Sequence, residues 1–417
     1  MSKKTQNDVL INGPVNVVRV EGNINGIKKV VYLFGDLHHD LDKQTECSDI
    51  HAQNIDTYIL DQFNKRKLKH KNKKLDFFFE TCPDYLDVNK KDMIYTSKYA
   101  WSVDKLFKNQ FMSNKNKTLP ALDYDDVRLH YVDFRCYLPS ILDDVIKTMK
   151  NVTSQYTFIK KKLHTCFNTT VVLYEKCTQI LKILKNPQKH KISVSVEGTK
   201  DMLSSSEHDE KQKFQILENF IYKIKKKYNN HDVGKIIEKS FDDHVVNEYI
   251  NFIKYIKESQ KIFLKLLRHA EKLEYKINIK YNDKHPILTD FNWGFDDNEI
   301  YKIQKKMSEH VDNIQLYDLN LHAIMIDFYM VRRFLDKNYI TNSISYTGIA
   351  HTSNTVYLLL KMFNFKITHI SKTNTNNIDE LNQIIVQQEN PFLTQHYIYP
   401  SLDVQCSDIT HFPTEFN

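Results

Sequence analysis

Glycine is scarce in this chain, and two of its eight glycines open the same pattern, Gly-x-x-His. The first copy is Gly35–His38 and the second is Gly348–His351. An apolar run of β-branched and aromatic residues precedes each copy, Val30–Phe34 in one case and Ile344–Tyr346 in the other. Glycine permits a sharp turn or a close backbone approach at the end of a strand. The pattern therefore predicts two strands that each end in a histidine-bearing turn, which is where ligands bind in open α/β sheets.

The N-terminal part of the chain alternates strand-like and helix-like segments. Asn25–Gly26 separates two apolar runs, which is typical of a β-hairpin. A helix beginning near Ser48 and a buried strand at Leu75–Phe79 are predicted next. A strand–helix–strand unit almost always has parallel strands and a right-handed crossover. Because parallel strands end at the same edge of a sheet, we expect His38 and Glu80 on one rim.

Two later segments extend the predicted sheet. A third strand is expected at Val127–Val132, ending before Asp133 and Arg135. The fourth strand is the one that leads to the second Gly-x-x-His, followed by a helix and a last strand near Phe365–Ile370. Four separate segments would then deliver polar side chains to the carboxyl ends of strands.

The middle of the chain has a different pattern. Between residues 151 and 320 apolar side chains recur every three or four positions, which is typical of amphipathic helices. The predicted fold class is therefore α/β, with a mainly parallel central sheet flanked by helices and interrupted by a long α-helical insertion. Residues 1–150 and 321–417 are expected to form the two halves of the α/β core, and residues 151–320 the insertion.

Taken together, these short motifs resemble the TraB, Tiki, ChaN and erythromycin-esterase superfamily. Its members carry a GExH-type turn after the first strand, a Glu ending the second, a later Asp/Arg element and a second GxxH before a helix. The matching segments here are Gly35–His38, Phe78–Pro83, Val132–Arg135 and Tyr346–His351, and the similarity covers about residues 28–140 and 320–375. The general character of the sequence, including Asp327 and Arg332 before the last motif, is also similar to that of uncharacterised proteins of large DNA viruses.

This resemblance implies a hydrolase acting on a peptide or ester bond. Its Tiki branch implies a divalent metal, zinc or manganese, that activates water, with His38, His351, Asp36 and Glu80 as ligands. Its esterase branch implies instead a metal-free site, in which an imidazole oriented by a carboxylate deprotonates water. Arg135 would hold a substrate carboxylate or stabilise an oxyanion. The ChaN branch binds haem, so the scaffold alone does not dictate catalysis.

One residue departs from the superfamily pattern, and several have structural alternatives. Asp36 stands where Glu is usual, which shortens the side chain by one methylene, on the order of 1.5 Å. Glu80 would equally serve to cap a helix N-terminus, and a structural bridge from Arg135 to Asp133 or another carboxylate is favoured over a role in catalysis. A catalytically inactive binding or structural protein, virion-associated in one version, is therefore the second functional hypothesis.

Other enzyme classes find less support in the sequence. Gly35–His38 also resembles the opening GDxH of calcineurin-like metallophosphoesterases, but the later GDxxD and GNH motifs of that family are missing. The chain has no Gly-x-Ser-x-Gly elbow and no glycine-rich phosphate loop.

Cysteine spacing, apolar runs and charge indicate compartment and partners. The cysteines lack CxxC spacing, so we expect reduced thiols at all six positions: Cys47, Cys82, Cys136, Cys166, Cys177 and Cys406. With neither a signal-peptide segment nor the ~18 apolar residues of a membrane span, we expect a cytoplasmic protein, in a host cell or virion, without a membrane partner. The net charge of +7 is modest and spread, which argues against a nucleic-acid partner. The basic stretch Lys65–Lys74 is interpreted as a solvated loop between a helix and a strand, with a nuclear-import or nucleic-acid patch as the alternative. The helical insertion is the expected surface for a protein partner.

Overall fold

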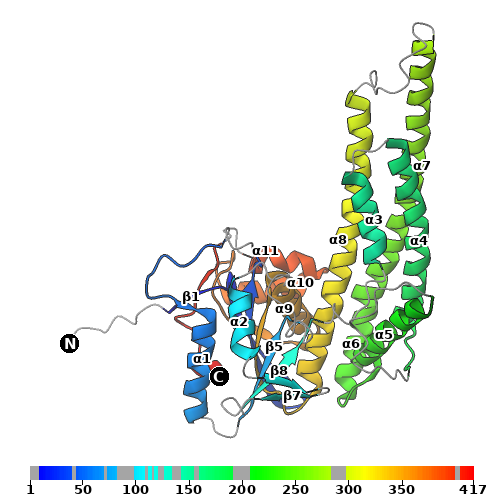
Figure 1. Ribbon diagram of the computed structural model, residues 1–417. Coiled ribbons are helices and arrows are strands. Elements are labelled where there is room, and N and C mark those ends of the chain that lie inside the picture. The colour runs from blue at the N-terminus through cyan, green and yellow to red at the C-terminus, as the bar shows by residue number, and fades with distance from the viewer. Residues whose placement is uncertain are drawn as a thin grey trace. The chain divides into compact units, whose positions relative to one another are not determined.

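The protein has mixed α/β architecture and divides into two compact units (Figure 1). The computed structural model describes residues 9–39, 44–69, 73–81, 98–108, 111–114, 117–120, 126–133, 142–154, 159–190, 207–282, 297–399 and 404–417. The first unit, called the sheet unit, comprises residues 1–137, 224–240 and 323–417, and the second, called the helical unit, comprises residues 138–223 and 241–322. The boundaries expected at residues 150 and 320 therefore differ from those of the two units. Residues 138–150 belong to the helical unit, and residues 224–240 belong to the sheet unit.

A six-stranded sheet with the order β10-β2-β3-β9-β5-β8 is the centre of the sheet unit. Its strands are β2 (Asn16–Ile24), β3 (Ile27–Asp36), β5 (Leu75–Phe79), β8 (Val127–Tyr131), β9 (Asn342–Gly348) and β10 (Lys366–Ile370). The pairs β3–β9, β9–β5 and β5–β8 are parallel, whereas β2 is antiparallel to both β10 and β3. The sheet is therefore mixed, with its antiparallel pairs at one edge.

The β2–β3 hairpin follows from two residues. Asn25 and Gly26 form the whole connection, because Ile24 pairs with Ile27. Asn25 and Gly26 both have positive φ, 51° and 79°. A two-residue loop with positive φ at both positions is the turn whose twist matches that of the flanking strands. The predicted hairpin is confirmed.

Strand β9 joins the two distant halves of the sheet. It lies between β3 and β5 and is parallel to both, so the strands joined by α1 are not neighbours. In this register Asp36 pairs with Gly348, and Phe79 pairs with Tyr346. The two Gly-x-x-His turns and the residue after β5 therefore lie next to one another at the carboxyl edge of the sheet.

Helices cover both faces of the sheet. On one face α1 (Ile55–Lys69) and α2 (Lys98–Lys108) pack on a core to which Ile59, Phe63 and the strand residue Phe77 contribute. On the other face α9 (Ile349–Phe363) packs against the neighbouring strands, as Figure 1 shows. The helix expected near Ser48 begins at Ile55.

Shorter elements complete the sheet unit. They are β1 (Leu10–Asn12), β4 (Gln53–Asn54), β6 (Phe111–Asn114), β7 (Lys117–Pro120), α6 (His231–Phe241), α10 (Ile378–Gln387), η6 (Pro391–Thr394), α11 (Gln395–Ile398), β11 (Cys406–Asp408) and η7 (Thr414–Phe416). Strand β1 pairs with β11 and β4 in a separate three-stranded sheet.

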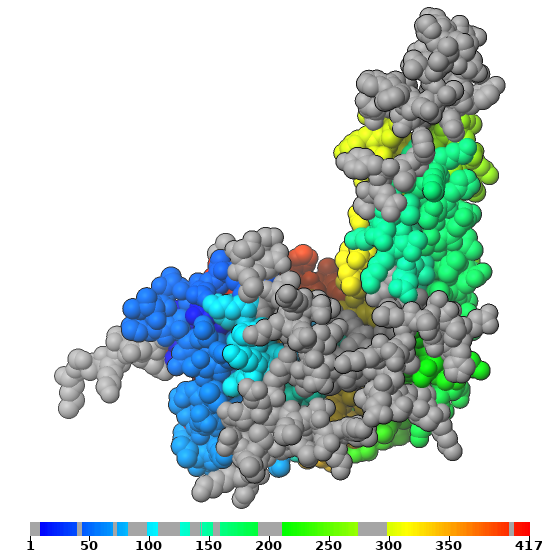
Figure 2. All heavy atoms as spheres, in the orientation of Figure 1, coloured from blue at the N-terminus to red at the C-terminus, as the bar shows by residue number. Residues whose placement is uncertain are grey.

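The helical unit consists of long helices packed along their lengths. These are α3 (Asp143–Ser154), α4 (Ile159–Lys185), α5 (Glu207–Lys226), the π-helical turn η5 (Asp242–Val246), α7 (Asn247–Asn282) and the first part of α8 (Asp297–Asp336). Buried side chains such as Leu173, Phe252 and Met307 form its core. Figure 2 shows the side chains of α3 and α4 packed beside each other. Among the described residues, no helix is apolar over enough length to cross a bilayer.

The structure corrects the expectation for the cysteines. Cys47 and Cys406 form a disulfide between segments 359 positions apart in the sequence. Both are on chain segments next to β1, and their pairing cannot be read from sequence spacing. Cys166 and Cys177 are buried free thiols, and Cys82 and Cys136 lie outside the described residues.

Candidate functional site

The carboxylate of Glu80 lies between two imidazoles. Its Oε2 atom is 3.6 Å from Nε2 of His38, and its Oε1 atom is 3.2 Å from Nε2 of His351. The backbone N–H of Gly348 also donates to Oε2, at 2.7 Å. The sheet register thus brings together three side chains that the sequence analysis placed on one rim, and Glu80 also caps the N-terminus of α9.

Gly348 makes this close approach possible. A Cβ atom at this position would lie 3.0 Å from Nε2 of His38 and 3.5 Å from Oε2 of Glu80. Its φ of −55° suits any residue, so the backbone conformation does not require glycine. The requirement is for space beside His38.

His351 is held from both sides by carboxylates. Its Nδ1 is 2.7 Å from Oδ1 of Asp327 on α8, and Oδ2 of Asp327 accepts a hydrogen bond of 2.8 Å from Asn354. His351 and Asp327 are only 6% and 1% exposed. With a carboxylate oxygen facing each ring nitrogen, the doubly protonated imidazolium is the favoured form.

The electrostatics of the cluster agree with this assignment. Burial lowers the pKa of His351, but Glu80 and Asp327 outweigh burial and hold that pKa well above its ordinary value. Burial raises the pKa of Glu80, but His351 and His38 reverse this and hold it well below its usual range. Burial also raises the pKa of Asp327, against the influence of His351 and Asn354. The inner part of the cluster is thus an ion network.

His38 is the member of the cluster that solvent reaches. Its side chain is 37% exposed, against 6% for that of Glu80, although its Nε2 atom is buried against the carboxylate. Burial lowers the pKa of His38, but Glu80 and Asp36 outweigh burial, so the pKa is raised above its usual value.

Asp36 fixes the backbone that carries His38. Its Oδ1 accepts the N–H of His38 at 2.8 Å, an Asx turn that supports the positive φ of 51° at His38. Its other oxygen accepts the Tyr346 hydroxyl at 2.6 Å, and Gln405 donates to Oδ1 at 3.2 Å. An Asx turn needs the short side chain of aspartate, which gives a physical reason for the departure from Glu.

The structure also shows which residues the sequence analysis placed differently or missed. Asp36 faces its own turn, Tyr346 and Gln405 rather than the imidazoles, and Arg135 lies outside the described residues. Asp327 had been noted only as part of a viral similarity. Its signal was a lone carboxylate within the apolar stretch 323–331 of a helix.

The donor set does not fit the zinc or manganese site expected from the resemblance. Nε2 of both imidazoles faces the same carboxylate at ion-pair distance, and Asp36 is engaged elsewhere. Within the part of the chain that the structure describes, no group of three or more His, Cys, Asp or Glu side chains could hold a metal ion.

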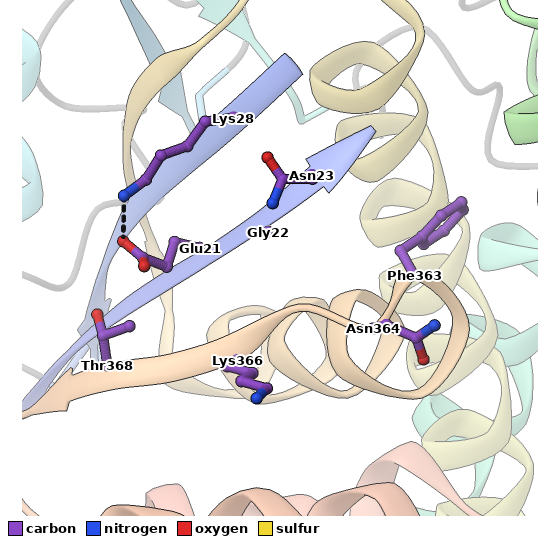
Figure 3. Close-up of a pocket in the computed structure, with 8 residues that line it drawn as sticks. All are labelled: Glu21, Gly22, Asn23, Lys28, Phe363, Asn364, Lys366 and Thr368. Atoms are coloured by element: carbon purple, nitrogen blue, oxygen red, sulfur yellow. Dashed lines mark ion pairs between the residues drawn. The ribbon is translucent and has the colours of Figure 1, made fainter. Parts of the chain in front are cut away.

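A marked hollow of about 410 Å³ lies away from this cluster (Figure 3). It is lined by Glu21, Gly22, Asn23, Lys28, Phe363, Asn364, Lys366 and Thr368. These residues lie at the hairpin end of β2 and β3, at the end of α9 and in β10, whereas the cluster lies where α9 begins. Glu21 is already ion-paired with Lys28 and Arg19, at 3.1 and 2.8 Å. The hollow therefore offers no chemistry comparable to that of the cluster.

Residues 9–417 match a family described as "Family of unknown function (DUF5847)". The chain belongs to this family. "Uncharacterized protein R706" of Acanthamoeba polyphaga mimivirus is 31% identical over 425 residues, which cover 98% of this chain and 97% of the relative. "Uncharacterized protein R161" of the same virus is 29% identical over 447 residues, covering 100% of both chains. No solved structure matches the chain. The similarity to viral proteins is confirmed, whereas the TraB-type resemblance has only the motifs as support.

Proposed function

We propose that the protein is a hydrolase of peptide or ester bonds in which His38 is the general acid–base. The observation that carries this proposal is the placement of a partly exposed imidazole against a buried carboxylate that is itself held by a second imidazole. Histidine oriented by a carboxylate is the commonest way to move a proton near neutral pH.

The proposed roles follow from exposure. Glu80 orients His38 through Nε2 and stabilises its charged form, so Nδ1 is the atom that exchanges a proton with water and substrate. His351 is buried and holds Glu80 rather than touching substrate, which makes it a positioning residue. Asp327 and Asn354 fix the orientation of His351 in turn.

In the proposed reaction neutral His38 takes a proton from water at Nδ1 as the water oxygen attacks the carbonyl carbon. The imidazolium then returns that proton to the leaving alkoxide or amine, and the C–O or C–N bond breaks. The second step needs the protonated ring, which the raised pKa of His38 favours. The first step needs the neutral ring, so it becomes more efficient as pH increases.

A binding or structural protein on the same scaffold is the second candidate. The observation in its favour is that Glu80 caps α9 through Gly348 N–H, so the ion network also has a structural use. In that case the cluster would stabilise the sheet edge without turnover.

Hydrolysis of ester and peptide libraries by the purified protein distinguishes the two. We expect His38→Gln to lower activity by about 100-fold or more, as for loss of a general acid–base. His39→Gln, a change of the same type at the adjacent position, should retain activity within about threefold, because His39 is not a member of the Glu80 cluster. Activity that survives His38→Gln would reject the proposal, and inactivity of the folded wild type on every substrate would favour the binding protein.

A further inference from the structure

Helix α7 carries a row of cations along one side. Six side chains form this row, which we call the α7 cation row: Lys254, Lys257, Lys261, Lys265, Arg268 and Lys272. Their spacing of three or four residues places all six within about 40° of one line along the helix, at 3.6 residues per turn. All six are exposed. The row is about 27 Å long, at 1.5 Å per residue.

Within the described residues, the charges of this row are not paired with carboxylates. Lys257 has an aromatic contact, with its ammonium 4.7 Å from the centre of the Tyr174 ring. In the described ranges, no carboxylate forms an ion pair with the other five members of the row. Glu258 and Glu271 are exposed too; at 100° per residue they lie about 20° and 40° beyond the two edges of the row, so they offset part of its charge and leave an excess of about four positive charges.

Part of the row also surrounds a hollow. Lys261, Lys265, Arg268 and Lys272 line a hollow of about 460 Å³ together with Leu264 and His269. A line of cationic side chains with apolar stems suits an extended chain of anions rather than a single small ion.

We propose that the α7 cation row binds the phosphate backbone of a nucleic acid. Phosphates repeat along a strand every ~3.4 Å of duplex axis, so a row of this length can meet several at once. The proposal does not depend on hydrolysis at the His38 cluster. It differs from the sequence-based expectation because charges spread along the chain are gathered on one face when α7 forms.

Two other partners fit the row less well. The apolar residues of α7 that a membrane-binding helix would insert are buried in the helical unit, among them Phe252, Ile256 and Phe263. A protein partner usually needs an exposed apolar or aromatic centre in the interface, whereas among the described residues that line the hollow only Leu264 is apolar.

The basic stretch at Lys65–Lys74 gives an informative contrast. There Arg66 is fully buried and donates to the backbone of Glu415, Lys65 pairs with Asp61 at 2.6 Å, and Lys69 pairs with Glu415. That stretch is denser in sequence, but these charges are used within the fold. In the folded protein, the cations of the α7 cation row are therefore better placed to bind a polyanion than those of the denser stretch.

Fluorescence anisotropy of the full-length protein with a labelled 24-base-pair DNA duplex tests this proposal. With about four phosphates contacted, log K should fall with log salt at a slope of about −3.6. The variant Lys261→Gln/Lys265→Gln/Arg268→Gln should lose at least tenfold in affinity at 0.1 M salt and have a shallower slope. Single-stranded DNA of the same length serves as the second probe, because the contacts are to phosphates.

A matched control removes the same charge elsewhere. Lys161→Gln/Lys182→Gln/Lys235→Gln changes three exposed lysines on α4 and α6 and should alter affinity less than threefold. Equal losses in both triple variants would show a net-charge effect and overturn the proposal. So would binding to vesicles rich in phosphatidylserine without binding to DNA, or wild-type binding too weak to measure at 0.1 M salt.

Discussion

Removal of the carboxylate behind His351 is the perturbation that most directly probes the ion network. Asp327→Asn keeps the shape of the side chain but removes its charge, 2.7 Å from Nδ1 of His351. Two unit charges at that separation attract by on the order of 6 kcal/mol at an effective dielectric constant of about 20. Desolvation offsets part of this, and breaking such a buried pair from one side typically costs about 3–5 kcal/mol. We therefore expect the free energy of unfolding to fall by about 3 kcal/mol.

A double-mutant cycle isolates the pair. His351→Gln alone leaves the Asp327 carboxylate without its cation and Glu80 with His38 alone, so we expect a loss of similar size, and the double variant should lose much less than the sum. The coupling energy should be about 2 kcal/mol or more near pH 6. Because the pKa of His351 is raised on folding, its contribution is complete below its ordinary pKa and is lost as pH rises through the raised value.

The fluorescence of a single tryptophan reports the unfolding of the sheet unit. The chain has two tryptophans, and a Trp293→Phe background leaves Trp101 on α2 as the only one. Urea unfolding of the four proteins of the cycle in this background, from pH 6 to pH 10, gives the coupling energy and its pH dependence. A coupling energy below about 0.5 kcal/mol near pH 6, or one that grows as pH rises, would refute the charged network.

Three further perturbations have defined outcomes. Gly348→Ala, whose Cβ would lie 3.0 Å from Nε2 of His38, should lower hydrolysis at least tenfold and stability by only about 1 kcal/mol; unimpaired turnover would remove the steric argument. Asp36→Glu should lose the hydrogen bond to the His38 N–H, with about 1–2 kcal/mol of stability and most activity, whereas full activity would show that the Asx turn is dispensable. Replacing Cys47 and Cys406 by serine should lower the free energy of unfolding by about 2–4 kcal/mol, and equal stability of oxidised wild type and variant would argue against the disulfide.

Local signals predicted much of the sheet. Asn25–Gly26 predicted the hairpin, and the apolar runs predicted the strand at Leu75–Phe79. They also predicted strands at Val127–Val132 and Ile344–Thr347, which the structure has at Val127–Tyr131 and Asn342–Gly348. These features depend on residues close in sequence, which is why they can be predicted from it. The order of strands is not local: nothing in the sequence states that β9 enters between β3 and β5, or that β10 pairs antiparallel with β2.

The candidate site was predictable only in its outer parts. His38, Glu80 and His351 each follow a recognisable strand, so their shared rim could be inferred from parallel geometry. The partners that set their charge could not, because Asp327 reaches His351 from the C-terminal half of a long helix. Gln405 reaches Asp36 from a segment next to the disulfide, with a sequence separation of 369.

The central claim, that His38 faces the Glu80 carboxylate in one charge-coupled cluster, is tested by NMR titration of the histidine ring protons. In the wild type we expect His38 to titrate above its ordinary pKa, and in Glu80→Gln we expect that pKa to fall, since the nearest negative charge is gone. A His38 pKa that is the same in both proteins would contradict the account.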